Sequence, residues 1–305
     1  MSEVMINGHD EIYVEKHGRL HITGSRFPSE HALMSALRNL SQYVGRELSP
    51  RNPILEARLP DGSRVEAIIP PASRGGANVC IRLFPRERLT FDRLVETGAI
   101  SSETADLLRE MVRCRHNVVI AGGSGSGKTS LLNALSSLIC EDERVVVIED
   151  AQELRLRLPH VVQLEAQPAD SRGTGAVTIR ELFRATLRMR ADRVVIGEIR
   201  GGEALDLIQA MTSGHRGCLS TVHGTLPIDT LSRLETMALM SDVRIPVNVL
   251  RAQIASAIDM IVQVARLPDG RRCVTHVVAV RGYDQLRGYQ LETLLEHSSR
   301  EEGSS

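Results

Sequence analysis

The chain has 305 residues, of which 42% are hydrophobic and 25% are charged, an ordinary composition for a soluble globular protein. At roughly 100 to 200 residues per domain, this length predicts two domains or one large one. The formal net charge of −1 gives no general attraction to nucleic acid or to an anionic membrane. Aromatic residues make up 3% and include no Trp, which leaves little material for base stacking. We therefore expect no direct nucleic-acid partner.

Three features of the sequence bear on the compartment. The first fifteen residues carry acids and no basic segment before an apolar run, so they do not resemble a secretory signal. The longest apolar stretch, residues 254–265, contains Asp259 and Gln263 and falls short of the roughly 18 apolar residues of a membrane span. The five cysteines form no C-x-x-C pair, which favours small buried thiols in a reducing compartment. We expect a cytoplasmic protein.

The first third of the chain predicts a small α+β domain over residues 1–84. Short strands are expected near residues 12–14 and 20–23, followed by a helix that Ser29 opens and whose apolar residues recur every three or four positions. The turn sequence Pro60-Asp61-Gly62-Ser63 separates two alternating runs and predicts a hairpin. A strand over residues 79–83 ends this domain. The charges and the proline of residues 84–90 suit an exposed connector, and we place the connector between the two domains at residues 85–100.

Beyond residue 100 the pattern alternates short β-branched runs with longer helical stretches. Strands are expected at residues 118–121, 144–148, 161–164, 194–196 and 219–222, with helices from about residues 128, 178, 202 and 227. Such alternation predicts crossover connections and a mostly parallel, buried sheet. A helix from about residue 246 and a hairpin around residues 268–270 close this domain, which we place at residues 101–290. The polar tail, residues 291–305, is expected to be disordered.

A glycine-rich segment matches the pattern G-x-x-x-x-G-K-[ST] between a predicted strand and a predicted helix. The segment consists of Gly122, Gly123, Ser124, Gly125, Ser126, Gly127, Lys128 and Thr129, with Ser130 following. Its backbone N–H groups and the helix N-terminus would hold phosphates, Lys128 would reach the β- and γ-phosphates, and the Thr129 hydroxyl would bind Mg²⁺. Lys16 and Lys128 are the only lysines among the 37 cationic residues, so a compact ammonium is specifically used here. The sequence predicts a P-loop that binds a nucleoside triphosphate with Mg²⁺.

Acids and histidines follow other predicted strands. Glu149, Asp150 and Glu153 come after one strand, and Glu198 comes after another, where the carboxyl ends of parallel strands face a nucleotide. Acids that follow strands also commonly serve only to solvate a loop, so each one alone is ambiguous. His215 and His223 flank a strand eight positions apart and both could lie near the nucleotide. They lack the neighbouring ligands typical of a zinc site.

Several segments in chain order resemble the ATPases of the type II and type IV secretion superfamily, and most closely the CpaF-like ATPases of Tad (Flp) pilus assembly. They are IEDAQEL, LRMRADRVVIGEIRGGEALDLIQAM, GH...STVH, LSRLETM and QIASAID, together with EVMINGHDEIYVEKHGRL, ARLPDGSRVEAIIPP and IRLFPRERLTFDRLVETGAI near the N-terminus. The resemblance covers residues 1–281. It implies a RecA-like P-loop NTPase domain with a mostly parallel sheet, preceded by a small α+β, PAS-like domain. It also implies Mg²⁺-dependent ATP hydrolysis by a hexameric ring that is cytoplasmic, peripheral at the inner membrane and partnered by inner-membrane platform proteins.

The resemblance also implies roles for single residues. Glu153, at the end of the Asp box that includes Asp150, is implied to position or activate the attacking water, and Glu198 is implied to act in hydrolysis beside the Mg²⁺. His215 and His223 match the His box, which senses the γ-phosphate. Arg188 and Arg233 match arginines with which the family compensates charge in the ATPase domain. Arg64 and Arg82 match arginines of the family's N-terminal domain and connector that reach toward a nucleotide.

The sequence departs from that branch at two places, and alternatives remain open. His223 is followed by Gly224 and Thr225 where the branch usually has Ala-Asn, and Ala191 stands where it usually has Pro. The first hypothesis is a motor ATPase for Tad/Flp pilus assembly or for secretion of its substrates. The second is a conjugative or type IV secretion traffic ATPase with the same core. A regulatory nucleotide-binding module with a degenerate site is a third, although the complete P-loop, Glu153 and Glu198 argue against it. A helicase is disfavoured by the absence of a basic or aromatic surface signal.

Overall fold

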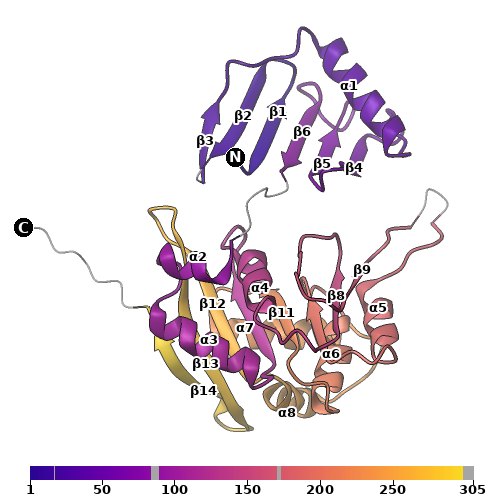
Figure 1. Ribbon diagram of the computed structural model, residues 1–305. Helices are drawn as coiled ribbons and strands as arrows, with labels where there is room; N and C mark the ends of the chain where they lie inside the picture. The colour runs from indigo at the N-terminus through magenta and orange to yellow at the C-terminus, as the bar shows by residue number, and fades with distance from the viewer. Residues whose placement is uncertain (17, 84–88, 170–172, 298–305) are drawn as a thin grey trace, which may run out of the picture. The chain divides into compact units, whose positions relative to one another are not determined.

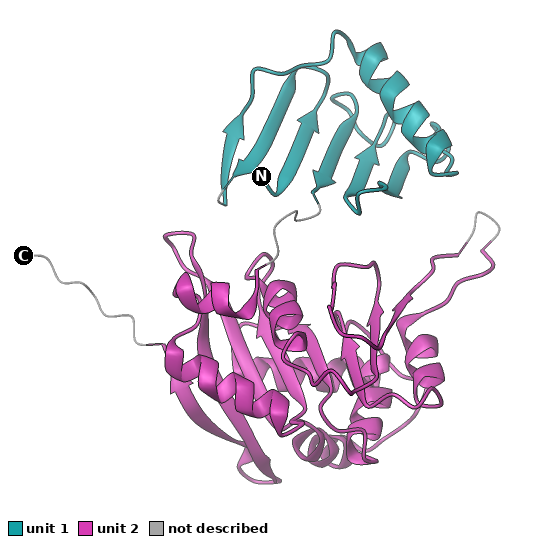
Figure 2. Ribbon diagram, in the orientation of Figure 1, with its two compact units in different colours: residues 1–88 teal, residues 89–305 magenta. Residues whose placement is uncertain are grey.

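The computed structural model describes residues 1–16, 18–83, 89–169 and 173–297, which form two compact units, Met1–Arg88 and Leu89–Ser305 (Figures 1 and 2). Part of the expected connector belongs to the second unit. Phe91, Leu94 and Ile100 are buried in the hydrophobic core of that unit, and Thr90 caps a helix there. Residues 91–100 of the expected connector are therefore part of the second unit, because Phe91, Leu94 and Ile100 have a core to enter. Leu89 and Thr90 are exposed, as expected. Residues 84–88 lie outside the described residues.

Unit 1 consists of a six-stranded antiparallel sheet in the order β3-β2-β1-β6-β5-β4, with one helix packed on one face (Figure 1). Its elements are β1 (Glu3–Asn7), β2 (Glu11–Lys16), β3 (Arg19–Ile22), α1 (Glu30–Tyr43), β4 (Ile54–Arg58), β5 (Arg64–Ile68) and β6 (Asn78–Arg82). The Ser29 side chain accepts a hydrogen bond from Ala32 N at 3.2 Å, so α1 begins where the sequence predicts. Leu33 and Leu37 from α1 pack on Ile12 and Val65 of the sheet. The expected small α+β fold is confirmed.

Unit 2 contains an eight-stranded, mostly parallel sheet in the order β14-β13-β12-β7-β11-β10-β8-β9. Its strands are β7 (Val118–Gly122), β8 (Val145–Glu149), β9 (Val161–Glu165), β10 (Arg193–Ile196), β11 (Leu219–His223), β12 (Met260–Arg266), β13 (Arg272–Asp284) and β14 (Gly288–Glu296). The pairs from β12 through β9 are parallel, and only the β12–β13 and β13–β14 pairs are antiparallel. Since β11 and β10 are inserted between β7 and β8, several carboxyl ends meet at one edge of the sheet.

Helices cover both faces of this sheet (Figure 1). They are α2 (Phe91–Glu96), α3 (Ser102–Arg113), α4 (Lys128–Ser136), α5 (Ile179–Thr186), α6 (Glu203–Thr212), α7 (Pro227–Leu239) and α8 (Val247–Ala257). Val118 and Ile120 face the core with α2, α3 and α4, whereas Val119 and Ala121 face the core with α5 to α8. Both faces of β7 are thus buried, as its continuous apolar run predicts. The RecA-like α/β fold class is confirmed.

The C-terminal expectation needs a correction. Residues 291–296 belong to β14, which pairs with β13, and so they are not a disordered tail. Leu291 packs against one core of unit 2, and Leu294 and Leu295 pack against the other. Burial of these leucines on both faces of a strand explains the order. Residues 298–305 of the expected tail lie outside the described residues.

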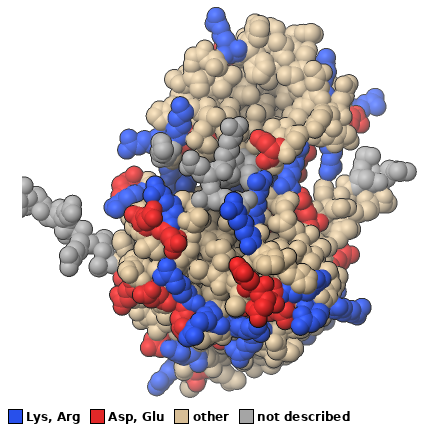
Figure 3. All heavy atoms as spheres, in the orientation of Figure 1, with Lys and Arg blue, Asp and Glu red and all other residues tan. Residues whose placement is uncertain are grey.

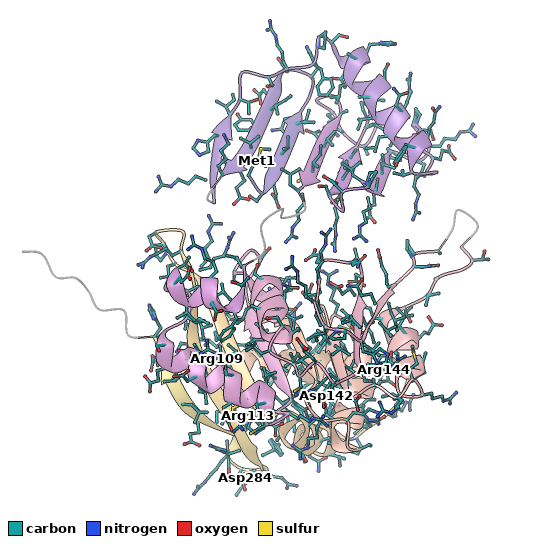
Figure 4. All side chains as sticks on the ribbon, in the orientation of Figure 1. Met1, Arg109, Arg113, Asp142, Arg144 and Asp284 are labelled. Atoms are coloured by element: carbon teal, nitrogen blue, oxygen red, sulfur yellow. The ribbon has the colours of Figure 1, made fainter. Side chains whose placement is uncertain are left out.

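The surface of unit 2 mixes charges of both signs. On the face shown in Figure 3, Lys and Arg side chains alternate with Asp and Glu side chains over this unit. Arg109 and Arg113 illustrate the pattern on α3 (Figure 4), where they pair with Asp106 at 3.1 Å and Glu110 at 2.8 Å. Within the described residues, every helix is too short or too polar to cross a bilayer.

All five cysteines are free thiols. Cys218 and Cys273 are buried, as expected, and burial raises the pKa of Cys218 to about 12. Three others are exposed, namely Cys80, Cys114 and Cys140. The expectation of buried thiols is therefore wrong for these three, which lie on an outward sheet face, a helix end and a turn.

Candidate nucleotide-binding and catalytic site

The P-loop connects the end of β7 to the start of α4. Gly127, the last residue before α4, has a φ of 98°, a left-handed conformation that glycine adopts without steric cost. The Ser126 hydroxyl donates to Gly123 O at 2.9 Å and is buried, whereas residues 123–125 are exposed. The loop therefore presents its backbone to solvent next to a helix N-terminus, an arrangement that binds phosphate.

Lys128 is buried and its ammonium group lies over the P-loop. Its Nζ donates to Gly122 O at 3.0 Å and to Gly123 O at 2.8 Å. It also lies 3.4 Å from Nδ1 of His223, at the end of β11. The two carbonyl contacts hold the positive charge at the place where phosphate oxygens would compete for it, because an ammonium binds charged oxygens more strongly than neutral ones.

His223 joins Lys128 to Glu198. Its Nε2 lies 2.8 Å from Glu198 Oε1, and its Nδ1 can accept from Lys128 Nζ when the ring is neutral. Burial lowers the pKa of His223, and the positive charge of Lys128 lowers it further against the opposing effect of Glu198. The imidazole of His223 thus contacts both the P-loop lysine and the acid after β10.

The second oxygen of Glu198 has a different partner. Oε2 accepts from Arg200 Nε at 2.8 Å and from Nη2 at 2.5 Å. Asp150, after β8, lies 3.0 Å from Nη1 of the same guanidinium group. The structure therefore brings together Lys128, His223 and Glu198, and it links Asp150 to them through Arg200.

Glu153 lies in a loop that Glu149 holds in place. Glu149 is the last residue of β8 and is 4% exposed. Its Oε1 accepts from Glu153 N at 2.9 Å and from Leu154 N at 3.0 Å. Burial raises the pKa of Glu149 to about 7, although these two backbone donors act in the opposite direction.

Glycine at position 197 makes this packing possible. A Cβ at Gly197 would lie 2.9 Å from Cγ of Glu149, closer than such atoms approach. Gly197 N donates to Ile148 O at 2.8 Å, and Thr221 Oγ1 donates to Gly197 O at 2.6 Å. The carboxyl ends of β8, β10 and β11 are therefore fixed together beside the acids.

An apolar pocket lies next to the P-loop within unit 2, lined by Leu94, Ile100, Leu131, Val264 and Val274. Arg272, at the start of β13, stands at this pocket and donates from Nε to Gly125 O at 2.7 Å. An apolar pocket beside a phosphate-binding loop, with one guanidinium group at its side, has the chemical character that a nucleotide base and sugar require.

Other predicted residues lie away from this cluster. His215 precedes β11 and His223 ends it, so the extended strand places the two histidines at opposite edges of the sheet. Arg188 and Arg233 are exposed, after α5 and on α7, and of these Arg233 is near enough to contribute to the lowered pKa of His223. Arg64 and Arg82 are directly paired neighbours on β5 and β6 of unit 1. The roles of all these residues stay predictions.

The residues at the P-loop fit Mg²⁺ held together with phosphates. The Thr129 hydroxyl and the Glu198 carboxylate supply oxygen donors, which Mg²⁺ prefers, and this ion usually keeps several water or phosphate ligands. Among the described residues, no group of three or more His, Cys, Asp or Glu side chains could hold a metal by itself. A protein that shares its Mg²⁺ with a nucleotide has no need of such a group.

The sequence did not single out two residues of this site, Arg200 and Arg272, and it gave Glu149 only as one of three acids that follow a strand. Glu149 is visible as an acid at the end of an apolar run, but only the structure shows that it is buried and accepts two backbone donors. Arg200 stands two positions after Glu198, and this closeness in the sequence is the local feature that could have pointed to its role. Arg272 is separated from Gly125 by 147 residues, and no local pattern connects them.

The chain is similar in sequence to known secretion and conjugation proteins. A family model described as type II/IV secretion system protein matches residues 1–293. A putative conjugal transfer protein of Mycobacterium tuberculosis is 33% identical over 286 residues, which cover 92% of this chain and 81% of the relative. The type IV secretion system protein PtlH of Bordetella pertussis is 38% identical over 261 residues, which cover 77% and 76%.

Solved structures show the same fold. The VirB11 ATPase of the Brucella suis type IV secretion system is 29% identical with a TM-score of 0.52, over 90% of this chain and 91% of that one. The Legionella pneumophila ATPase DotB is 21% identical with a TM-score of 0.62, over 89% and 74%, and this likeness concerns the fold alone.

Proposed function

The chain belongs to the type II/IV secretion system protein family, and from this premise we propose that it is a Mg²⁺-dependent ATPase motor of a secretion or pilus machine. The observation that carries the proposal is the continuous chain of contacts from the P-loop through Lys128 and His223 to Glu198. A structural P-loop without a catalytic task would not require an acid linked to its lysine. The resemblance of the sequence to secretion ATPases and the family match point to the same activity.

The residues divide the work of hydrolysis. Water attacks the γ-phosphorus, the bond from that atom to the β,γ-bridging oxygen breaks, and ADP and phosphate leave. Glu153 or Glu198 accepts the proton of the water as it attacks. The ammonium group of Lys128 moves with the negative charge on the phosphates. Because His223 contacts both Lys128 and Glu198, this movement changes the position of the Glu198 carboxylate. Thr129 and Glu198 would hold the Mg²⁺, which when bound neutralises charge on the phosphate oxygens.

The arginines complete the charge balance in this proposal. Developing charge on the γ-phosphate requires cations beyond Lys128, and Arg188, Arg233, Arg64 and Arg82 are the candidates. Some would act on the nucleotide of a neighbouring subunit. We therefore infer a closed homo-oligomer, a hexamer by resemblance to the family, that works in the cytoplasm at the inner membrane against platform proteins of the machine.

Two machines are candidates for this motor. The names of the relatives favour conjugal transfer or type IV secretion. The segments IEDAQEL and LRMRADRVVIGEIRGGEALDLIQAM, together with the N-terminal ones, favour Tad/Flp pilus assembly. The shared chemistry is ATP-driven movement of macromolecules through an envelope machine, and the site is the same in both cases.

A genetic experiment separates the two machines. The gene is deleted in its source organism and complemented with the wild type or with Lys128→Ala, and surface pili and conjugative transfer are both measured. Loss of pili alone, restored only by the wild type, supports pilus assembly. Loss of transfer or of secretion alone supports the second machine. Full function of Lys128→Ala in both assays would contradict an ATPase motor.

A further inference from the structure

Arg200 occupies a fixed place in the loop between β10 and α6. Its backbone N donates to Glu203 Oε1 at 2.7 Å, and Gly201 N donates to the same oxygen at 2.8 Å. Glu203 is the first residue of α6 and is 8% exposed. The helix thus anchors the backbone from which the guanidinium group of Arg200 extends, so the reach of that group is set by the fold.

The guanidinium group of Arg200 bridges two acids from two strands. It donates twice to Oε2 of Glu198, and its third nitrogen pairs with Oδ2 of Asp150. Those acids follow β10 and β8, which are parallel neighbours with Ile196 paired to Ile148. A planar fork can hold two carboxylates in this way, whereas a single ammonium group has no such fixed geometry.

This bridge gives the two oxygens of Glu198 different surroundings. Oε2 is held by Arg200, and Oε1 lies 2.8 Å from His223 Nε2, on β11, which stands between β10 and the P-loop strand β7. A guanidinium group is not deprotonated in proteins. The guanidinium group therefore stays charged.

We propose that Arg200 is a positioning residue for ATP hydrolysis: its guanidinium group fixes the Glu198 carboxylate with one oxygen toward the P-loop and couples that orientation to Asp150. This inference rests on the proposed ATPase function. Arg200 differs from the arginines that are expected to contact the phosphates of the nucleotide, because its partner is the catalytic acid Glu198. Loss of such a charged hydrogen-bonded contact should lower kcat by about 10- to 100-fold.

Four variants of the full chain test the proposal: Arg200→Ala, Arg200→Lys, Asp150→Asn and the double variant Arg200→Ala/Asp150→Asn. A matched control is Arg180→Ala, because Arg180 also bridges two acids in unit 2, Asp206 at 2.6 Å and Asp242 at 2.7 Å. Steady-state phosphate release gives kcat and KM, a fluorescent ATP analogue gives the Kd, and thermal unfolding gives Tm.

The expected result separates positioning from binding and from folding. Arg200→Ala should keep the Kd within about 3-fold and lose most of kcat, and Arg200→Lys should recover only a small part. Asp150→Asn should add no further loss in the Arg200→Ala background, because both changes break one bridge. Arg180→Ala should keep kcat even if its Tm falls.

Other results overturn the inference. A kcat of Arg200→Ala within 2-fold of the wild type would do so, as would multiplicative effects of the Arg200 and Asp150 changes, or a loss in Arg180→Ala equal to that in Arg200→Ala. Failure of the proposed function looks different, since the wild-type chain itself would then release no phosphate in the presence of Mg²⁺.

Discussion

The buried carboxyl group of Glu149 makes the stability of the protein depend on pH in a predictable way. Its pKa is about 7 instead of 4.5, mainly because burial disfavours the carboxylate. The folded protein therefore keeps a proton that the unfolded chain releases between about pH 4.5 and pH 7. Since the unfolded chain binds fewer protons in this window, the free energy of unfolding falls as pH rises through it.

The magnitude follows from the same two values. A difference from 4.5 to about 7 corresponds to about 3 kcal/mol at about 1.4 kcal/mol per pH unit. Most of this destabilisation, about 2 to 3 kcal/mol, should develop between about pH 5 and pH 8. Glu149→Gln cannot ionise but keeps a carbonyl oxygen that can accept from Glu153 N and Leu154 N. The variant should therefore be more stable than the wild type at pH 8 and similar to it near pH 5.

Urea unfolding of the full chain, followed by circular dichroism at several pH values, measures this difference. Glu141→Gln serves as the control, because Glu141 is an exposed acid of the same unit, and it should keep the pH dependence of the wild type. Parallel pH profiles for Glu149→Gln and the wild type would refute the reasoning, and so would a variant that is less stable than the wild type at pH 8.

Three further predictions concern nucleotide binding, catalysis and assembly. Arg272→Ala should raise the KM for ATP by about 5- to 20-fold with little change in kcat. Arg271→Ala should leave the KM unchanged, because the Arg271 side chain pairs with Asp269 instead. Equal KM values for the two variants in a phosphate-release assay would exclude a role for Arg272 in ATP binding. Glu153→Gln should keep ATP binding and lose most of kcat, because an amide cannot accept the proton of the water, and unchanged turnover would remove Glu153 from the catalytic residues. Turnover should rise more than linearly with protein concentration, and mixing Arg64→Ala with Lys128→Ala subunits should restore activity if Arg64 serves a neighbour's site; a fully active monomer in analytical ultracentrifugation would contradict the ring.

Local signals were enough to predict most of the secondary structure. The Ser29 cap, the Pro60-Asp61-Gly62-Ser63 turn and the apolar run before Gly122 each act within a few residues, and each prediction holds. The outer strand β14 was missed because Leu291 and Leu295 lie in a polar stretch. Only their packing against the core explains the strand.

Some residues of the candidate site can be predicted from the local sequence, and others depend on the order of the strands in the sheet. The P-loop is one continuous segment, so Lys128 and Thr129 can be found from spacing alone. The link from Lys128 through His223 to Glu198 depends on the strand order β7-β11-β10, which pattern alone does not give. His215 and His223 are separated for another reason, since the strand between them is extended and a helical segment of the same length would have brought them closer.

The most direct test of the account is Mg²⁺-dependent phosphate release by the purified full chain and by Glu198→Gln, with ATP binding measured on the same samples. We predict that the wild type hydrolyses ATP and that Glu198→Gln binds ATP with a similar Kd while losing nearly all turnover. Equal turnover in both proteins, or a wild type that binds ATP and never releases phosphate at any protein concentration, would contradict it.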